Sequence, residues 1–307
     1  MQGFRRVAQV ASLALCLALT ACGGNASSGS SSDASASRAG LPDFSHVVVV
    51  VMENHEYGRI VRAPQAPYIN SLARQYAIAT RYHAVSHPSL PNYLALTGGR
   101  TFNITSDCTQ CPVSRPNLVD QLEQAHISWK AYMEGMPSPC YSGAVAGRYA
   151  KKHDPFLYYD DIVKRRDRCS KVVPLSELDG DVRAGKLARF AWITPDLCHD
   201  MHDCSVAAGD SYLHKLLPPI LDKLGSNGAL FLTWDEGSSK SGCCKKASGG
   251  HVATIVAGPA ARHGARSAMP FDHYSLLRTI EEAWKLPKLG DAGCPCTHAM
   301  IRLFSAK

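Results

Sequence analysis

Five polar residues in three distant segments have the side chains that covalent phosphoryl transfer requires. Glu53 and Asn54 follow one apolar run, Asp235 and Glu236 follow another, and Ser89 lies between two prolines. A serine hydroxyl is a weak nucleophile at neutral pH, and coordination to a metal activates it. Carboxylate and amide oxygens would hold a divalent cation that also neutralises a phosphoryl oxygen. We therefore predict a single cation that all five residues contact.

Other polar residues are candidates for proton transfer and for substrate binding. Asn92, three residues after Ser89, is placed to donate a hydrogen bond to the transferred phosphoryl group. Histidines commonly protonate a leaving oxygen or position a water, and the candidates are His199, His202, His251 and His273. Lys152 and His153 are candidates to bind a phosphate, although a plain surface loop explains them equally well.

Residues 195–203 contain three aspartates and two histidines directly after an apolar run. This density is high for a plain loop, so we predict that the segment takes part in the site. A second ion bound by Asp200, His202 and His251 is an open alternative, because imidazole binds zinc readily.

Apolar runs end at these polar groups, which predicts how the fold brings them together. Val47–Val51 is a run of β-branched residues, typical of a strand buried on both faces of a parallel sheet. Such strands present their carboxyl ends to the ligand crevice. Apolar patterns predict further strands at 128–133, 190–194, 229–233 and 251–257, and helices at 67–77, 118–125, 210–224 and 274–284. Residues 137–159 are expected to form a long loop. The third helix contains Pro218 and Pro219, which predict an interruption. The alternation predicts an α/β fold with a mainly parallel central sheet and helices on both faces.

The amino-terminal region predicts export. Residues 1–22 combine two early arginines with an apolar core that is too short to span a membrane, which is typical of a signal peptide. The segment closes on Leu19–Cys22, which resembles a bacterial lipobox, so Cys22 is the predicted lipidation site; a conventional secretory signal is the alternative. Residues 23–40 read as a flexible Ser/Ala/Gly linker, and the folded domain is predicted at 41–307. We expect the protein to act at the outer face of the cell membrane or as a secreted form.

Charge and cysteine content narrow the class of protein further. The formal net charge of +7 over 307 residues is mildly basic, which suits anionic substrates but not nucleic-acid binding. Apart from Cys16 and Cys22, ten cysteines remain, an even number that predicts disulfides in an exported chain. Their pairing does not follow from the sequence, but the adjacent Cys243 and Cys244 are expected to have different partners. A zinc site that includes Cys108 and Cys111 is the rival interpretation.

Several spaced motifs resemble one known family. They are MENH (52–55), HPSLPNY (87–93), DMHD (200–203), TWDE (233–236) and HYSLLRTIE (273–281), joined by APYINSLA (66–73) and YAKKH (149–153). In this order they resemble the phosphoesterase family of acid phosphatases and phospholipases C, within the alkaline phosphatase superfamily. The likeness is strongest to its secreted acid phosphatases of mycobacterial type, and it covers essentially all of residues 44–286.

The resemblance implies a role for each matching residue. Ser89 would be the transiently phosphorylated nucleophile, Asn92 would hold the phosphoryl group, and the metal ligands would be Glu53, Asn54, Asp235 and Glu236. The two-zinc members of the superfamily have an aspartate and an Asp-His pair at these strand ends. The oxygen-rich set found here favours one hard ion, Ca²⁺, Mg²⁺ or Mn²⁺, over a two-zinc centre.

Three functions remain as interpretations of the sequence. The leading one is a metal-dependent acid phosphatase acting on phosphate monoesters, with phosphoinositides among the candidate substrates. The second is a phospholipase C that cleaves a phosphodiester, although the chain shows no obvious lipid-binding extension. The third is a metal-stabilised lipoprotein that binds a ligand without turnover. In each case the expected partners are a phosphate-ester or phospholipid head group and, through the lipid anchor, a membrane.

Overall fold

A computed structural model describes residues 40–305 of the chain. The predicted signal peptide, its Cys22 and nearly all of the predicted linker lie outside the described residues. Within residues 40–305, no helix combines the length and apolar character needed to cross a membrane.

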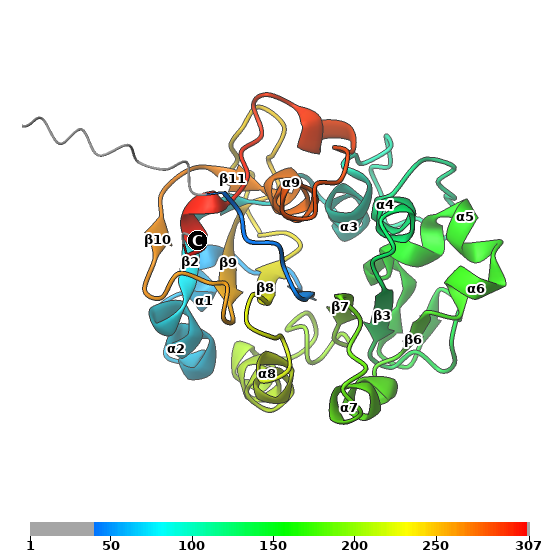
Figure 1. The fold of residues 1–307 in the computed structure, drawn as a ribbon, viewed down its shortest axis with the longest axis horizontal. Helices are drawn as coiled ribbons and strands as arrows, with labels where there is room; N and C mark the ends of the chain where they lie inside the picture. The colour runs from blue at the N-terminus through cyan, green and yellow to red at the C-terminus, as the bar shows by residue number, and fades with distance from the viewer. Residues whose placement is uncertain (1–39, 306–307) are drawn as a thin grey trace, which may run out of the picture. The chain divides into compact units, whose positions relative to one another are not determined.

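The central element is a sheet in the strand order β10-β2-β9-β8-β1-β7-β3-β6, with β11 paired to β2 (Figure 1). Strands β1, β7, β8, β3 and β6 are mutually parallel wherever they pair, whereas β9 runs antiparallel to both of its neighbours. The prediction of a mainly parallel α/β sheet is therefore confirmed. The strands are β1 (Val47–Met52), β2 (Ala77–His83), β3 (Trp129–Met133), β6 (Val172–Pro174), β7 (Phe190–Thr194), β8 (Ala229–Trp234), β9 (His251–Ala257), β10 (Arg266–Ser267) and β11 (Phe271–Asp272).

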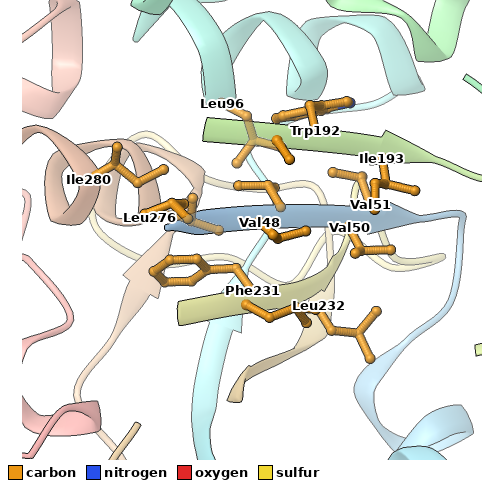
Figure 2. Close-up of a cluster of buried hydrophobic side chains, with 14 of the residues drawn as sticks. Val48, Val50, Val51, Leu96, Trp192, Ile193, Phe231, Leu232, Leu276 and Ile280 are labelled. Carbon is orange, nitrogen blue, oxygen red and sulfur yellow. The ribbon is translucent and has the colours of Figure 1, made fainter. Parts of the chain in front are cut away.

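Strand β1 lies in the middle of this sheet because both of its faces are apolar. All six of its residues are fully buried. Figure 2 shows Val48, Val50 and Val51 between side chains of β7 and β8 and those of two covering helices. Burying a valine side chain contributes roughly 1.5–3 kcal/mol, so five consecutive valines fix this strand firmly. The carboxyl end of this buried strand then fixes the position of the next residues, Glu53 and Asn54.

Helices cover both faces of the sheet, as predicted. In Figure 1, α3 (Ser89–Gly98), α4 (Leu118–Gln124) and α9 (His273–Ala283) lie on one side, and α2 (Pro67–Gln75), α7 (Ser176–Arg183) and α8 (Val206–Leu221) lie on the other. The short helices are α1 (Tyr57–Ile60), α5 (Asp160–Val163) and α6 (Arg166–Cys169), with 3₁₀ turns η1 (Lys151–His153), η2 (Pro155–Tyr158), η3 (Gly290–Gly293) and η4 (Ile301–Leu303).

Two predictions about regular structure are wrong. Helix α8 is not interrupted at its prolines but runs on to Leu221. The carbonyls that Pro218 and Pro219 leave without an N–H donor are those of His214 and Lys215, which lie at exposed positions where water can bind them. The region 137–159, expected to be a long loop, contains a small hairpin of β4 (Val145–Ala146) and β5 (Tyr149–Ala150) followed by η1 and η2. Here buried side chains such as Tyr149 and Phe156 attach short elements to the core.

The ten remaining cysteines all form disulfides; in four of the five pairs the partners lie within six residues of each other, and in the fifth they lie 29 residues apart. The pairs are Cys108–Cys111, Cys140–Cys169, Cys198–Cys204, Cys243–Cys244 and Cys294–Cys296. The prediction that Cys243 and Cys244 have different partners is therefore wrong. Positive φ values at Cys244 (60°) and Lys245 (66°) form a tight turn, which lets the adjacent cysteines pair with each other. The rival zinc site at Cys108 and Cys111 is replaced by a disulfide between them.

Candidate active site

The carboxyl ends of β1 and β8 bring the first predicted ligands together. These neighbouring strands pair in parallel, with Met52 opposite Trp234, so the residues that follow them emerge side by side. The Asn54 N–H donates to Asp235 Oδ1 at 3.1 Å, and the Asp235 N–H in turn donates to the Met52 carbonyl at 2.9 Å. Glu53 and Asp235 are fully buried, whereas Asn54 is exposed. The sheet itself therefore fixes this half of the site.

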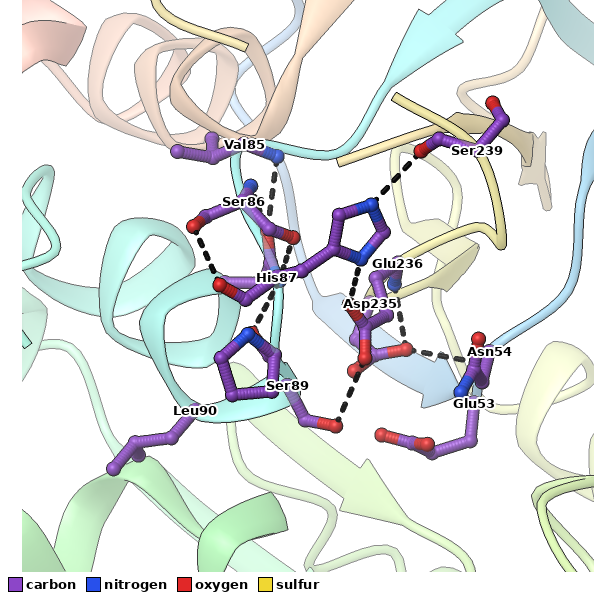
Figure 3. Close-up of polar contacts among 12 residues, drawn as sticks. Glu53, Asn54, Val85, Ser86, His87, Ser89, Leu90, Asp235, Glu236 and Ser239 are labelled. Atoms are coloured by element: carbon purple, nitrogen blue, oxygen red, sulfur yellow. Dashed lines mark hydrogen bonds and ion pairs between the residues drawn. The ribbon is translucent and has the colours of Figure 1, made fainter. Parts of the chain in front are cut away.

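Ser89 is the first residue of α3 and faces these carboxylates. Its hydroxyl donates to Glu236 Oε1 at 3.4 Å, and its side chain is almost fully buried (Figure 3). The sequence predicted that residues 89 and 236, separated by 147 positions, meet at one edge of the sheet, and this proximity is confirmed. An amino-terminal helix position also directs backbone N–H groups toward an anion bound there.

Several carboxylate oxygens at this edge are buried without a hydrogen-bond donor. Among the described residues they are Glu53 Oε1 and Oε2, Asp235 Oδ2 and Asp200 Oδ2; of these, Glu53 Oε1 and Asp200 Oδ2 face His153 as an ion-pair partner, whereas Asp235 Oδ2 has none. Burial and the charge of Glu53 raise the pKa of Asp235 well above its ordinary value. An unpaired buried carboxylate is costly, and a cation relieves that cost. The predicted ligands therefore fit a hard divalent ion in two respects: they offer oxygen atoms, and some of their buried oxygens lack a hydrogen-bond donor.

His153 contributes a positive charge to the same cluster. Its Nε2 lies 2.8 Å from Glu53 Oε1, and its Nδ1 lies 3.6 Å from Asp200 Oδ2. Burial opposes protonation, but the charges and hydrogen bonds of Glu53 and Asp200 outweigh it and raise the pKa of His153 to about 9. His202 reaches the cluster from outside, with its Nε2 3.8 Å from Glu53 Oε2 and its side chain one-third exposed. His153 is thus buried within the cluster, whereas His202 lies at its solvent-facing side.

Lys152 is held near the first turn of α3 by Asp107, a residue that was not among the predicted site residues. The Lys152 ammonium donates to Asp107 Oδ2 at 3.1 Å, while Asp107 Oδ1 accepts from the Leu90 N–H at 3.0 Å. The pKa of Lys152 is raised, because Glu53, Asp107 and Asp235 outweigh its burial. Asp107 thus links the first turn of α3 to the predicted phosphate-binding lysine. Its only sequence signal is its position next to Cys108.

His87 is a second residue that the sequence-based selection missed. Its Nδ1 forms an ion pair with Glu236 Oε2, and its Nε2 contacts the Ser239 carbonyl at 2.8 Å (Figure 3). It fixes the carboxylate that faces the Ser89 hydroxyl. The signal was present, since His87 opens the HPSLPNY motif two residues before Ser89.

Asn92 and His273 support the site from behind. The Asn92 Oδ1 accepts from the Val85 and Ser86 N–H groups, both at 2.9 Å, and its Nδ2 donates to the Ser86 and Pro88 carbonyls. The fully buried His273 has its Nε2 2.6 Å from the Asp235 carbonyl. Burial lowers the pKa of His273 to about 4, so the ring is neutral and donates there. Phosphoryl binding by Asn92 and proton transfer by His273 stay predictions.

His199 and His251 lie in other surroundings. His199 Nδ1 is 2.9 Å from Glu134 Oε1, and its ring stacks on Tyr212 at 4.1 Å. His251 stacks on Tyr57 at 4.4 Å and contacts the Thr80 carbonyl at 3.1 Å.

Between residues 40 and 305, two groups of three side chains place their ligand atoms within 4.8 Å of one another. They are Glu134–Asp196–His199 and Cys243–Cys244–Asp272. The alternative second-ion set of Asp200, His202 and His251 is not such a group, because His251 is held by Tyr57 and Thr80 instead. Glu53, Asp235 and Glu236 do not form one either, so their fit to a cation rests on donor type and on the unpaired oxygens.

Comparison with known proteins identifies related chains. A model of the Phosphoesterase family matches residues 60–287, a segment that contains Ser89, Asp235 and Glu236 and begins after Asn54. A phosphatidylinositol-3-phosphatase of Mycobacterium tuberculosis is 34% identical over 258 residues, which is 82% of this chain and 81% of that protein. A probable acid phosphatase of Kluyveromyces lactis is 31% identical over 80% of this chain, which spans 60% of the yeast protein. An acid phosphatase of Aspergillus fumigatus is 29% identical over 73% of this chain and 52% of its own length.

Solved structures share the fold at low sequence identity. A Vibrio parahaemolyticus protein of the alkaline phosphatase superfamily superposes with a TM-score of 0.53 at 12% identity, over 83% of this chain and 71% of that one. A phosphonate monoester hydrolase from Silicibacter pomeroyi gives 0.54 at 10% identity, over 83% and 76%. The lipoteichoic acid synthase of Listeria monocytogenes gives 0.57 at 9% identity, over 86% and 77%. These likenesses show the alkaline-phosphatase-like fold.

Proposed function

Since this chain belongs to the Phosphoesterase family and is a hydrolase of phosphoric esters, we propose that it is a metal-dependent phosphomonoesterase with a phosphoserine intermediate on Ser89. The observation that carries the proposal is the Ser89 hydroxyl, 3.4 Å from Glu236 and facing a cluster of buried carboxylates. The unpaired oxygens of that cluster need a cation. A binding protein without turnover has no use for a nucleophile in this position.

The residues of the chain divide the chemistry between them. Glu53, Asn54, Asp235 and Glu236 would hold a divalent cation, which would neutralise charge on the phosphoryl group and activate the Ser89 hydroxyl. Ser89 Oγ attacks phosphorus, its proton passes to Glu236 Oε1, and the bond from phosphorus to the leaving oxygen breaks. His202, which is exposed on one side, protonates that oxygen. Lys152 and His153 hold the non-bridging oxygens. A water then attacks phosphorus and gives a proton to His202, the bond from phosphorus to Ser89 Oγ breaks, and Glu236 returns its proton to Ser89.

The substrate and the location of the enzyme belong to the same proposal. A relative named phosphatidylinositol-3-phosphatase, 34% identical, supports phosphate monoesters that include phosphoinositides. The five disulfides within residues 40–305 suit an oxidising compartment, which supports export. We propose that the enzyme works outside the cytoplasm, either anchored through a lipid on Cys22 or secreted. Its substrate would then be a phosphate ester reached from that side.

The test compares Ser89→Ala with Ser211→Ala, an exposed serine on α8 that serves as the matched control. We expect Ser89→Ala to lose hydrolysis of p-nitrophenyl phosphate by about a thousandfold or more with an unchanged circular dichroism spectrum, while Ser211→Ala keeps full activity. Acid quenching of the wild type during turnover should trap a phosphate on Ser89, detected by peptide mass spectrometry. Undiminished activity in Ser89→Ala would exclude Ser89 as the nucleophile.

The phosphodiesterase alternative has its own discriminating substrate. We expect p-nitrophenyl phosphate to be hydrolysed much faster than p-nitrophenyl phosphorylcholine, because Lys152 and His153 hold charged non-bridging oxygens of a dianion. A preference for the phosphorylcholine ester would make the protein a phospholipase C type of enzyme. Activity that survives thorough chelation would contradict the metal requirement.

A further inference from the structure

A cavity of about 1060 Å³ opens at the end of α3 that is opposite to Ser89. Its walls come from the chain after α3 (98–104), the segment 111–116, Tyr274 of α9 and the segment 288–291. Gly98 lies nine residues along the helix from Ser89, about 13 Å away at 1.5 Å per residue. None of the residues that surround the Ser89 hydroxyl lines this cavity. It is therefore a separate space from the candidate active site.

Three cationic side chains line the cavity: Arg100, Arg115 and Lys288. In the part of the chain that the structure describes, none of them forms an ion pair with a carboxylate. The single acidic residue in the wall, Asp291, already pairs with Lys246. The positive charge of the cavity is thus not compensated from within the protein. A concave surface of one charge sign concentrates counter-ions.

The remaining lining suits an anion that also has hydroxyl groups. Thr101, Asn103 and Ser114 offer polar hydrogen-bonding groups, and Phe102, Ile104 and Leu289 supply apolar wall. Apolar walls exclude water and strengthen the attraction between the cations and a bound anion. The cavity is also far larger than a single phosphate ion, whereas a phosphorylated sugar or cyclitol ring would fill much more of it.

We propose that this cavity is a second binding site for a phosphate-bearing ligand, distinct from the hydrolytic site. The guanidinium groups of Arg100 and Arg115 pair with phosphate oxygens in bidentate fashion, and Lys288 adds a point charge. Two sources share this chemistry: free phosphate, which the reaction releases, and the head group of a phosphoinositide in a membrane. The site does not depend on the proposed reaction, because it uses none of the residues assigned to it.

The test uses the full protein carrying Arg100→Glu and Arg115→Glu, both at exposed positions. Its matched control carries Arg74→Glu and Arg302→Glu, two exposed arginines outside the cavity, so that the change in net charge is equal. Titration calorimetry measures binding of inorganic phosphate and of myo-inositol 1,3-bisphosphate in the Ser89→Ala background. Co-sedimentation measures binding to phosphatidylcholine vesicles that contain phosphatidylinositol 3-phosphate.

We expect the cavity variant to lose at least tenfold in affinity for one of these ligands while the control variant does not. Loss for free phosphate alone assigns the product as ligand, and loss for the bisphosphate and the vesicles assigns the head group. Equal affinities in the two variants, or no binding by the parent protein at millimolar concentration, would overturn the proposal. With Ser89 restored, hydrolysis of p-nitrophenyl phosphate should be the same in both variants, so a failure here is distinguishable from failure of the proposed reaction. If the double variant does not fold, Arg115→Ala with Lys288→Ala replaces it.

Discussion

Two clusters of carboxylates and histidines lie at strand ends of this sheet, and they differ in how their oxygens are satisfied. In the first, Glu134 Oε1 faces His199 Nδ1 at 2.9 Å and Oε2 accepts from the Asp196 N–H at 3.0 Å. Asp196 Oδ1 accepts from the Cys198 and His199 N–H groups, both at 2.9 Å. In the second, around Ser89, Glu53 Oε2 and Asp235 Oδ2 are buried without a hydrogen-bond donor, and Glu53 Oε1 has only an ion-pair contact with His153 at 2.8 Å.

This difference separates a structural network from an open site. The Glu134 cluster is the more compact of the two and has the better spacing for an ion, yet its hydrogen bonds already hold the loop after β7 in place. The Ser89 cluster contains buried carboxylate oxygens of Glu53 and Asp235 that lack a hydrogen-bond donor, and they lie close to the proposed nucleophile. Density of ligand-type residues alone does not identify a site, whereas unpaired buried oxygens point to a missing cation.

Asp235→Asn in one cluster and Asp196→Asn in the other are expected to give the largest contrast. Asp235→Asn removes a predicted metal ligand, so hydrolysis of p-nitrophenyl phosphate should fall by about a thousandfold, or ~4 kcal/mol of transition-state stabilisation. In chelated protein the same change should raise the melting temperature, because it removes one of two adjacent buried carboxylates. Asp196→Asn should leave activity within about threefold and lower the melting temperature. If Asp196→Asn lost activity and Asp235→Asn kept it, the reaction would belong to the Glu134 cluster instead.

Metal binding should stabilise the folded protein through the Ser89 cluster alone. At a free ion concentration of 100 times Kd, a single site adds about 2.7 kcal/mol to the free energy of unfolding. We expect Ca²⁺, Mg²⁺ or Mn²⁺ to raise the melting temperature of chelated wild type and of His199→Ala equally, measured by differential scanning fluorimetry. The shift should disappear in Glu53→Gln. A shift that survives Glu53→Gln and is lost in His199→Ala would place the ion at Glu134 instead.

Glu281 is a buried carboxylate outside both clusters, and it allows a comparison with them. It is fully buried in α9, its Oε1 accepts from the Leu289 N–H at 2.7 Å, and its Oε2 has no partner. Burial raises its pKa to about 7. The folded state then retains a proton that the unfolded state loses near pH 4.5, so this residue makes stability fall as pH rises from about 4.5 to 7.

Glu281→Gln should abolish that loss, with a gain of about 2 kcal/mol in the free energy of unfolding at pH 8 and little change at pH 4. Urea denaturation at the two pH values measures it. Glu282→Gln, on a partly exposed neighbour, is the matched control and should show no such pH dependence. A gain that is equal at both pH values would mean that Glu281 is ionised throughout, like a carboxylate with a compensating charge.

The sequence predicted the strands and helices that a local residue pattern specifies, and it missed those that depend on pairing with a strand far away in the sequence. Five consecutive valines specify a strand buried on both faces wherever it occurs, and the residues following β1 and β8 were therefore placed correctly at one edge. Strand β2 was missed because it follows α2 without a break, and its burial depends on antiparallel pairing with β9, more than 170 residues later. The prolines of α8 misled because the two carbonyls that they leave without a donor lie at exposed positions, where water can satisfy them.

Within the site, residue type predicted proximity but not the hydrogen bonds that decide a role. Ser89, Glu53 and Asp235 come together because strand ends must meet. Asn92 was assigned to the phosphoryl group on its spacing and on the family resemblance, and that role stays a prediction; the sequence did not predict its four hydrogen bonds to the loop before Ser89. His251 was grouped with Asp200 by type, but its stacking on Tyr57 takes it elsewhere. Such contacts depend on loop geometry that no local pattern specifies.

The smallest expected effect concerns Asp107. Like Asp196 it accepts a hydrogen bond from a backbone N–H group, but it lies near the carboxylates around Ser89. It accepts from the Leu90 N–H and from Lys152, so it sets where that ammonium stands relative to Ser89. Asp107→Asn keeps the acceptor for Leu90 but loses the charge that holds Lys152. We expect KM for p-nitrophenyl phosphate to rise about tenfold, which corresponds to ~1.4 kcal/mol, while kcat changes less than threefold.

Lys152→Met should raise KM similarly, and the double variant should be no worse than either single variant, since both changes remove one interaction. Asp222→Asn, an exposed carboxylate just after α8, is the charge-matched control and should leave KM within about twofold. Additive effects of Asp107→Asn and Lys152→Met would show that Asp107 acts on Ser89 through the first turn of α3 and not through the lysine.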